Sequence, residues 1–471
     1  MSRMSDSEAI MWAVEKDPAL RSDFCNLTLL ESPTDPDRLR VKIADAIAGI
    51  PRLGQRVVSA PLRIVPPEWV DDPDLDIEYH VRRVAAPEPG GTRELLDLCG
   101  QLAETAFDRS RPLWEFTVID GLEGGRTAML QKMHHTITDG VGGLKLSLAL
   151  VDFERDPQSP AADELQADGG EPHDFENGET DSATVPRHSP IDVLRGALGD
   201  VVGRHLSATR GVAAGAGRLV THPTEAPGSA LDALRMAGSL RRQLLVVDPA
   251  RSTVLTGRSL RRHLEVFTVA MPEARAAAQR LGGSLNDLFV TGVAGALGRY
   301  EEKMGGTASE LRMAMSISTR KRGEQTANRF VPTRLLVPTD PNDAGERFAA
   351  IADRLGRSRS EPALGAADLL AGFASGLPTS MLVAATHSQT RTIDFATSNL
   401  RGSPVPLYLA GARILANYPI GPRTGCALNV TVLSYCDELH MGLNIDPAAV
   451  TDIPLLMRHL DESFAELLDG R

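Results

Sequence analysis

The order of apolar and polar residues predicts a chain of alternating helices and strands. Residues 127–134 form an alternating run, which is typical of a strand, whereas apolar positions recur at helical spacing in 272–281, 285–304 and 453–468. Further strands are predicted over 263–271, 312–319, 330–338, 412–419, 427–435 and 438–445. Strands interspersed with helices in this way predict an α/β fold.

One segment interrupts this pattern and divides the chain. Residues 156–186 are rich in Pro, Gly, Asp and Glu and poor in apolar residues, so they cannot bury enough surface to offset their ordering entropy and we expect them to be disordered. Residues 191–245 have apolar positions near helical spacing and predict helices. The sequence therefore predicts two α/β domains, at 1–153 and 251–471, joined by a partly disordered and partly helical connector at 154–250.

Composition and charge narrow the class of protein. The chain has 471 residues, of which 42% are hydrophobic and 24% charged, which is ordinary for a soluble globular protein. Nine acidic residues of the segment 156–186 account for most of the net charge of −12, so the folded remainder carries no strong field. Because no basic stripe with interleaved aromatic residues is present, we expect no nucleic-acid partner.

The spacing of the cysteines and the length of the apolar runs indicate the cellular compartment of the protein. Its four cysteines, Cys25, Cys99, Cys426 and Cys436, form no C-x2-C pair, so neither a disulfide framework nor a zinc ribbon is indicated. No run approaches about 18 consecutive apolar residues, and the first residues lack a signal-peptide pattern. We therefore expect a cytoplasmic protein.

The segment His134-His135-Thr-Ile-Thr-Asp139-Gly140 is the strongest chemical signal in the sequence. Because it follows a predicted strand, His134 and His135 should point to opposite faces, so that one can reach a reaction chamber while the other packs in its wall. Asp139 could orient the imidazole directly or pair with a distant arginine, and the sequence leaves both open. Gly140 removes a side chain where a large substrate could approach the backbone.

These residues favour a general base over a metal site or a covalent nucleophile. A lone histidine at a strand end is commonly structural, but the doubled histidine, the spaced aspartate and the glycine favour a catalytic role for His135. No H-E-x-x-H motif or second histidine cluster occurs, so no metal is expected. The sequence also lacks a G-x-S-x-G elbow, a Walker A motif and a G-x-G-x-x-G motif. A base without an evident nucleophile indicates direct attack of a substrate hydroxyl on an activated acyl group.

The same segment resembles the active-site motif of the bacterial wax ester synthase/diacylglycerol acyltransferases, within the wider group of HHxxxDG acyl-CoA-dependent acyltransferases. The resemblance covers most of the chain outside 154–250. It is carried by PRLGQRV (51–57), WVDDPDLDIEYHVRRV (69–84), DRSRPLWEF (108–116), SLNDLFV (284–290), ANRFVPTRLLVP (327–338), SNLRGSPVPLYLAGARI (398–414) and YPIGPRTGCALNVTVLSYCDELHMGLNID (418–446). It implies two chloramphenicol-acetyltransferase-like domains with mixed sheets and an active site in a tunnel between them.

The resemblance also implies roles for residues of the first predicted domain. His135 matches the family's general base, His134 supports it, and Asp139 and Gly140 shape the loop that presents it. The aromatic residues of PLWEF match a family motif as well, but large aromatic residues dominate protein cores, so we expect Trp114 and Phe116 to pack in the core.

In the second predicted domain the resemblance implies substrate-binding residues. Asn286 and Asp287 match the family's ND motif near the tunnel, and Asn286 could equally be a helix N-cap. Ser398 and Asn399 match its SN motif, in which Asn399 would help to hold or polarise the thioester carbonyl, although this segment could also be an ordinary turn. Gly411 matches a stretch associated with the acyl or alcohol pocket.

The implied activity is acyl-CoA-dependent O-acylation of diacylglycerol, of long-chain alcohols, or of both. Acyl-CoA would be a co-substrate, with no further cofactor, and the lipophilic acceptors imply peripheral contact with the inner membrane face or a lipid droplet. Arg401 and Ser403 stand where the family commonly has proline, which leaves the acceptor open, and the oligomeric state is not indicated. Two alternatives remain: an HHxxxDG enzyme with another acceptor or a carrier-bound donor, and a lipid-binding coat protein whose 191–245 helices lie on a membrane.

Overall fold

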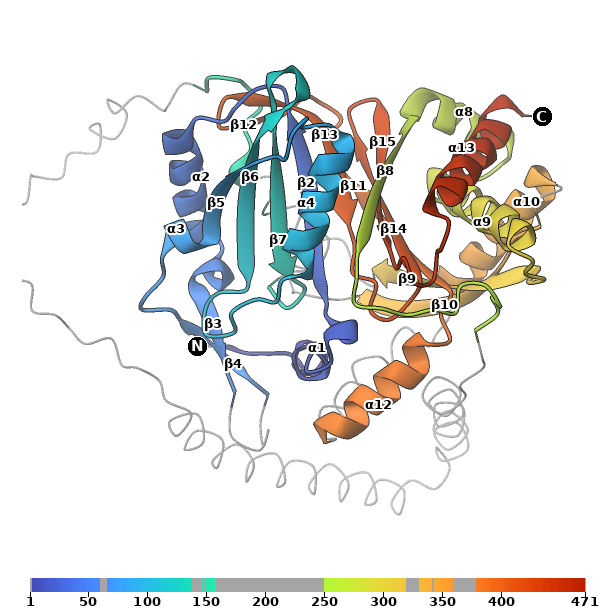
Figure 1. The fold of residues 1–471 in the computed structure, drawn as a ribbon, viewed down its shortest axis with the longest axis horizontal. Coiled ribbons are helices and arrows are strands. Elements are labelled where there is room, and N and C mark those ends of the chain that lie inside the picture. The colour runs from blue at the N-terminus through green and yellow to red at the C-terminus, as the bar shows by residue number, and fades with distance from the viewer. Residues whose placement is uncertain are drawn as a thin grey trace, which may run out of the picture.

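The computed structural model describes two six-stranded sheets that lie side by side, each covered by helices (Figure 1). The described residues are 2–59, 66–137, 146, 149–157, 250–318, 330–340, 343–359 and 378–470. The acidic segment 156–186 lies almost entirely outside them, and the predicted helices of 191–245 lie wholly outside them. Asp139 and Gly140 are also outside the described residues, so their predicted roles stay predictions.

The first sheet has the strand order β12-β13-β2-β7-β6-β5. Its strands are β2 (Asp23–Leu30), β5 (Val81–Ala85), β6 (Trp114–Leu122), β7 (Arg126–His134), β12 (Tyr408–Leu409) and β13 (Ala412–Ile420). Because β5 and β6 pair in parallel while the other neighbours are antiparallel, the sheet is mixed, as expected. The run at 127–134 forms β7 (Arg126–His134), so the predicted strand is confirmed.

Two strands of the first sheet come from the second half of the sequence. β13 pairs antiparallel with β2, from Ile414 opposite Leu30 to Ile420 opposite Cys25, and β12 continues the sheet beyond β13. β13 also lies against β14 and β15 of the second sheet, where Gly442 leaves room for the carbonyl of Pro419. Residues 408–420 therefore tie the two halves together through a backbone ladder.

The second sheet has the order β10-β9-β11-β14-β15-β8 and is also mixed, since β11 pairs in parallel with both β9 and β14. Its strands are β8 (His263–Ala270), β9 (Glu310–Ser318), β10 (Phe330–Pro338), β11 (Phe395–Arg401), β14 (Leu428–Tyr435) and β15 (Glu438–Ile445). The helices of this half are α8 (Met271–Arg280), α9 (Leu285–Lys303), α10 (Ala344–Arg359), α12 (Thr379–Thr390) and α13 (Ile453–Asp469). The strands and helices predicted for this region are thereby confirmed.

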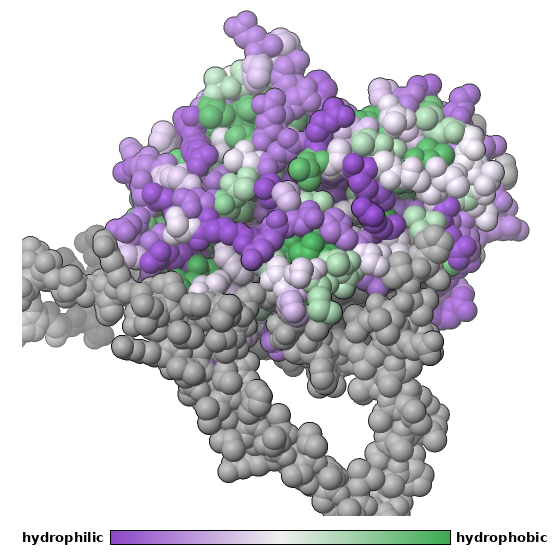
Figure 2. Space-filling view, turned by 60° about the horizontal axis from the view of Figure 1, so that its bottom comes forward, coloured by the Kyte–Doolittle hydropathy of each residue, from purple (hydrophilic) through white to green (hydrophobic). Residues whose placement is uncertain are grey.

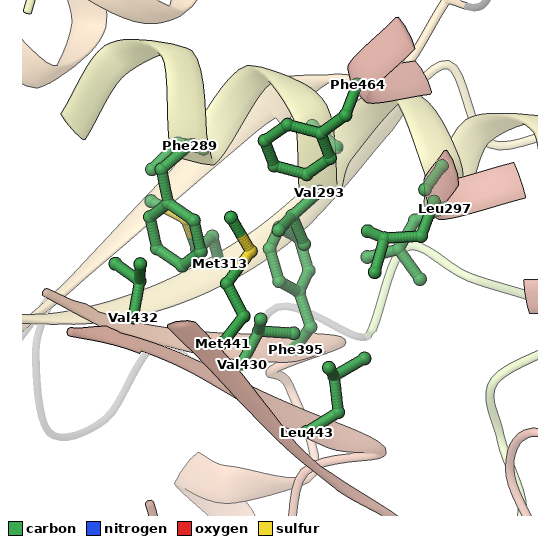
Figure 3. Close-up of a cluster of buried hydrophobic side chains, with 14 of the residues drawn as sticks. Phe289, Val293, Leu297, Met313, Phe395, Val430, Val432, Met441, Leu443 and Phe464 are labelled. Carbon is green, nitrogen blue, oxygen red and sulfur yellow. The ribbon is translucent and has the colours of Figure 1, made fainter. Parts of the chain in front are cut away.

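The core of the second half lies between this sheet and the helices packed on it. Figure 3 shows Phe289 and Val293 of α9 and Phe464 of α13 above Met313, Phe395 and strand residues of β14 and β15. Phe289, Phe395 and Phe464 are each at most 1% exposed, and burying an aromatic side chain stabilises a fold by about 1.5–3 kcal/mol. This packing fixes α9 firmly on the sheet.

The remaining elements cover the first sheet or connect its strands. They are β1 (Ser2–Arg3), α1 (Asp6–Val14), η1 (Pro18–Leu20), α2 (Pro36–Gly49), η2 (Pro51–Gly54), β3 (Gln55–Val58), β4 (Glu68–Asp71), α3 (Ile77–His80), α4 (Thr92–Glu104) and η4 (Glu123–Gly125). β1, β4 and β3 form a small separate sheet. α1 packs against α12 of the other half, and His387 of α12 hydrogen-bonds Asp17, three residues after α1, at 2.6 Å.

The aromatic residues of PLWEF belong to the core, as predicted. Trp114 is completely buried, donates from Nε1 to the carbonyl of Leu53 at 2.8 Å and stacks on His80 with 4.4 Å between ring centroids. Phe116 is 1% exposed and lies beside it. The hydrogen bond and the stacking explain the position of Trp114 without any contact to a substrate.

Two observations concern the membrane and the surface. Among the described residues, no helix has the length and apolar character needed to cross a bilayer. On the face in Figure 2, hydrophilic residues predominate and hydrophobic residues form small separate patches.

Candidate active site

His134 and His135 lie where β7 ends, and their side chains have different environments. His134 is 1% exposed, whereas His135 is half-buried and its ring packs on Phe24 with 4.8 Å between centroids. The backbone N–H of His135 donates to the carbonyl of Ser22 at 3.2 Å. The two histidines therefore differ as alternation along a strand requires.

The hydrogen bonds of His134 define which nitrogen carries its proton. The backbone N–H of Thr136 donates to Nδ1 at 3.1 Å, so Nδ1 must be an acceptor in the neutral ring. The proton is therefore on Nε2, which donates to Oε1 of Glu15 at 2.5 Å. His134 is held at both nitrogens and has a supporting position rather than a reacting one.

Glu15, just beyond the end of α1, links the start of β2 to the end of β7 next to His135. Its Oε1 also accepts the backbone N–H of Ser22 at 2.8 Å, and Oε2 accepts from Arg109 at 3.1 Å. Burial raises the pKa of the Glu15 carboxyl, but the hydrogen bonds from His134 and the Ser22 N–H and the charge of Arg109 outweigh it and lower the pKa overall. The carboxylate is thus kept ionised.

Sequence reasoning did not single out Glu15. It lies 119 residues from His134, in a stretch that resembles the family's usual start only loosely, and no spacing rule connects the two residues. An acidic residue directly after an amphipathic helix was the only local signal.

Glu15, Asp23 and His134 offer three possible metal-ligand atoms within 4.8 Å of one another. The proton on Nε2 of His134 is already donated to Glu15, so this nitrogen presents no lone pair to a cation. Burial, followed by the charge of Glu15, raises the pKa of Asp23, which also disfavours a ligating carboxylate. The arrangement fits a hydrogen-bonded support for β2 and β7 better than a cation site.

The backbone directly after His135 is held by Arg52. This side chain donates to the carbonyl of Thr136 at 2.6 Å and pairs with Oε1 of Glu8 at 2.6 Å. Glu8 is 1% exposed, so the guanidinium has a buried counter-charge. α1 therefore supports the histidine segment at two points, through Glu8 and through Glu15.

The structure brings together Asn286 and Asn399, which the sequence assigned to separate motifs. Asn399 of β11 donates from Nδ2 to Oδ1 of Asn286 in the first turn of α9, at 3.0 Å. Asn286 is not the N-cap of α9, because Ser284 takes that position and forms a capping box with Asp287. Asp287 therefore has a structural role in starting the helix.

Ser398 is half-buried and lies within β11 opposite Thr431 of β14. The SN segment is thus part of a strand and not of a turn. Its predicted contact with a thioester remains a prediction, as does the substrate role of Asn286.

Gly411 lies at the other end of the first sheet from the histidines. Ala410 and Gly411 have φ of 46° and 86° and form the two central positions of the β12–β13 hairpin, which is the geometry of a type I′ turn. In the register of β2, His134 is opposite Asp23 and Ile414 is opposite Leu30, so the two ends are about 24 Å apart. The turn accounts for the glycine, and its predicted pocket role is untested.

Two family models match this chain. The one described as wax ester synthase/diacylglycerol acyltransferase catalytic domain matches residues 4–289, and the one described as WS/DGAT C-terminal domain matches residues 326–468. The chain belongs to the wax ester synthase/diacylglycerol acyltransferase family. Membership in this family makes it an acyltransferase and confirms the resemblance found in the sequence.

Curated relatives match this chain over nearly its whole length and theirs. A putative diacylglycerol O-acyltransferase of Mycobacterium tuberculosis is 33% identical over 99% of this chain and 92% of its own length. A probable diacylglycerol O-acyltransferase of the same species is 26% identical over 94% of this chain and 90% of its own length.

Solved structures share the fold. The wax ester synthase/diacylglycerol acyltransferase from Marinobacter aquaeolei VT8 superimposes with a TM-score of 0.63 at 22% identity, over 99% of this chain and 98% of that one. The first condensation domain of the calcium-dependent antibiotic synthetase gives a TM-score of 0.58 at 15% identity, over 99% and 96%. The predicted architecture of two domains with mixed sheets is thereby confirmed.

Proposed function

We propose that this acyltransferase moves an acyl group from acyl-CoA to the hydroxyl of diacylglycerol, a long-chain alcohol, or both, with His135 as the general base. The observation that carries the proposal is the contrast between the two histidines. His134 is 1% exposed and uses both ring nitrogens in structural hydrogen bonds, whereas His135 is only half-buried, with its backbone fixed by Ser22 and its ring packed on Phe24.

In this mechanism the imidazole of His135 takes the proton of the acceptor hydroxyl as the oxygen attacks the thioester carbonyl carbon. The tetrahedral intermediate then collapses, the carbon–sulfur bond breaks, and the CoA thiolate takes the proton back from the imidazolium. A general base of this kind contributes about 10²–10⁴-fold to the rate, and positioning and electrostatics contribute the rest. Acyl-CoA is the only co-substrate that the mechanism requires.

The test follows free CoA with a thiol reagent. Palmitoyl-CoA is supplied as donor with 1,2-dioleoylglycerol or hexadecanol as acceptor, and the lipid product is identified by chromatography. His135→Ala should lower acceptor-dependent CoA release by at least about 100-fold, while His459→Ala, at a half-buried histidine of α13, should leave it unchanged. Full activity in folded His135→Ala would overturn the role of His135.

A carrier-bound acyl donor is the second candidate, because condensation domains share the fold. Turnover with an acyl-phosphopantetheinyl carrier protein, but not with palmitoyl-CoA, would favour it. We also infer that the protein contacts a lipid surface peripherally, since its proposed acceptors partition into membranes and lipid droplets. Co-flotation with liposomes that contain dioleoylglycerol tests this inference, and a protein that stays at the bottom of the gradient contradicts it.

A further inference from the structure

A row of uncharged polar side chains crosses three neighbouring strands of the first sheet. It consists of Asn26 and Thr28 on β2, Gln131 on β7 and Asn417 on β13, and we call it the amide row. Asn26 is opposite Gln131 in the β-ladder, and Thr28 is opposite Asn417. Gln131 and Thr28 are each 3% exposed, whereas Asn26 and Asn417 are half-buried.

The amide row lies on the same face of the sheet as His135. Side chains at every second position of a strand share a face, so Asn26 and Thr28 follow Phe24, whose ring packs on His135. On β7 the same alternation places Gln131 on the side of His135. With about 3.4 Å per residue, the row begins about 7 Å along β2 from Phe24 and extends to about 14 Å.

The hydrogen bonds within the row use only part of its capacity. Asn26 donates from Nδ2 to Oε1 of Gln131 at 3.2 Å and to Oγ1 of Thr28 at 3.3 Å. Thr28 in turn donates to Oδ1 of Asn417 at 3.2 Å. Within the described part of the chain, these bonds leave the Nε2 donors of Gln131 and the Nδ2 donors of Asn417 for other acceptors.

Such a row is costly on an otherwise apolar face unless something uses it. Met129 and Met133 of the same face belong to the hydrophobic cluster of the first half, and an amide enclosed by apolar side chains destabilises a fold unless its donors find acceptors. The two remaining donor groups match acceptor-only oxygens. A long-chain alcohol offers none beyond its reacting hydroxyl, whereas 1,2-diacylglycerol offers two ester carbonyls, attached through ester oxygens at the glycerol carbon next to the one that bears the hydroxyl and at the carbon after that.

We propose that the amide row binds the ester carbonyls of a diacylglycerol acceptor and thereby favours diacylglycerol over long-chain alcohols. This inference rests on the proposed function. A site that hydrogen-bonds its substrate discriminates against an analogue without the partner groups, because its polar atoms are then left unpaired. Gln131 and Asn417 are the donors to the carbonyls, and Asn26 and Thr28 hold them in place.

The first test changes the substrate and leaves the protein unaltered. The kcat/KM of the wild-type protein is measured for 1,2-dioleoylglycerol and for its diether analogue, which has the same chains but no carbonyls, with palmitoyl-CoA as donor. Two neutral hydrogen bonds predict a preference of about 10–100-fold for the diester. Equal values for diester and diether overturn the proposal even if no variant can be purified.

The second test changes the donors to apolar side chains of similar shape. Gln131→Met and Asn417→Leu should each lower kcat/KM for dioleoylglycerol by about 3–10-fold and leave the values for the diether and for hexadecanol unchanged. Thr117→Val is the matched control, because Thr117 is buried in β6 opposite Leu130, on the other face of the sheet, and should not change the ratio.

The outcomes separate this inference from the proposed function. If the wild-type protein releases no CoA with any acceptor, the proposed function fails. If it is active and the variants lower all acceptors equally, only the amide row fails. A higher KM for palmitoyl-CoA with an unchanged diester-to-diether ratio assigns the row to the pantetheine arm and overturns the proposal as well.

Discussion

Glu15 and His134 are joined by a 2.5 Å hydrogen bond across 119 residues of sequence. This bond, together with the one from the Ser22 N–H to Glu15, connects the end of α1 with the ends of β2 and β7. His135 follows His134 directly and is bound through its own N–H to Ser22. The orientation of His135 therefore depends on a carboxylate that needs no contact with substrate.

Replacing Glu15 should separate its two functions, as hydrogen-bond acceptor and as charge. Glu15→Ala leaves two buried N–H donors and Arg109 without the carboxylate, and should lower the free energy of unfolding by about 3–5 kcal/mol. Glu15→Gln keeps an oxygen at the Oε1 position and should cost less than half as much. Urea unfolding measures both, and equal losses in the two variants would contradict the acceptor role.

The Asn286–Asn399 hydrogen bond should couple α9 to β11. Asn286→Ala, Asn399→Ala and the double variant form a cycle in which we expect a coupling of about 0.5–1.5 kcal/mol in the free energy of unfolding. If the pair also contacts substrate, we expect the variants to lower turnover even under conditions in which they remain fully folded. Additive stability losses from the single variants would show that the bond does not contribute.

Gly411→Ala should destabilise the hairpin rather than change substrate choice. At φ 86° an alanine is strained by about 1–2 kcal/mol, and its Cβ would approach Nη1 of Arg38 to 2.9 Å. Gly49→Ala at the end of α2 is the control, because a Cβ there meets nothing within 4 Å. Thermal unfolding measures the loss, and an altered diacylglycerol-to-alcohol ratio would instead support the predicted pocket role.

His440 should make the fold sensitive to acid. Burial lowers its pKa to about 4, from about 6.5 in an unfolded chain. The carboxylate of Glu438 lies 3.4 Å from Nε2, but it is half exposed and screened by water. Between these two pH values the unfolded chain binds a proton that the folded chain does not, so the free energy of unfolding falls as the pH falls, by about 3 kcal/mol in all.

His440→Phe should remove this dependence while keeping a ring beside Tyr418, which contacts His440 edge-on at 5.0 Å between centroids. Because burial also lowers the pKa of His80, the variant removes one residue's share of the slope and not all of it. Urea unfolding between pH 4 and pH 6.5 measures the slope for both proteins. An identical slope in the variant would contradict the assignment to His440.

The sequence by itself determined the local elements, because the spacing of apolar and polar residues is a local property of the chain. The alternating run at 127–134 and the strand-like run at 438–445 gave the bounds of β7 and β15, and helical spacing gave α9 and α13, each within one or two residues of the structure. The same alternation predicted that His134 and His135 differ, and the burial of His134 agrees. Motif order further identified the family, which the family models confirm.

Only the tertiary structure decided which distant residues meet. The insertion of β13 into the first sheet pairs residues about 390 positions apart, and backbone ladders carry no signature of their partner in either sequence. For the same reason Glu15, the Asn286–Asn399 pair and the amide row were not predicted as groups. Each member is an ordinary polar residue by itself, and its role comes from neighbours that folding brings within hydrogen-bonding distance.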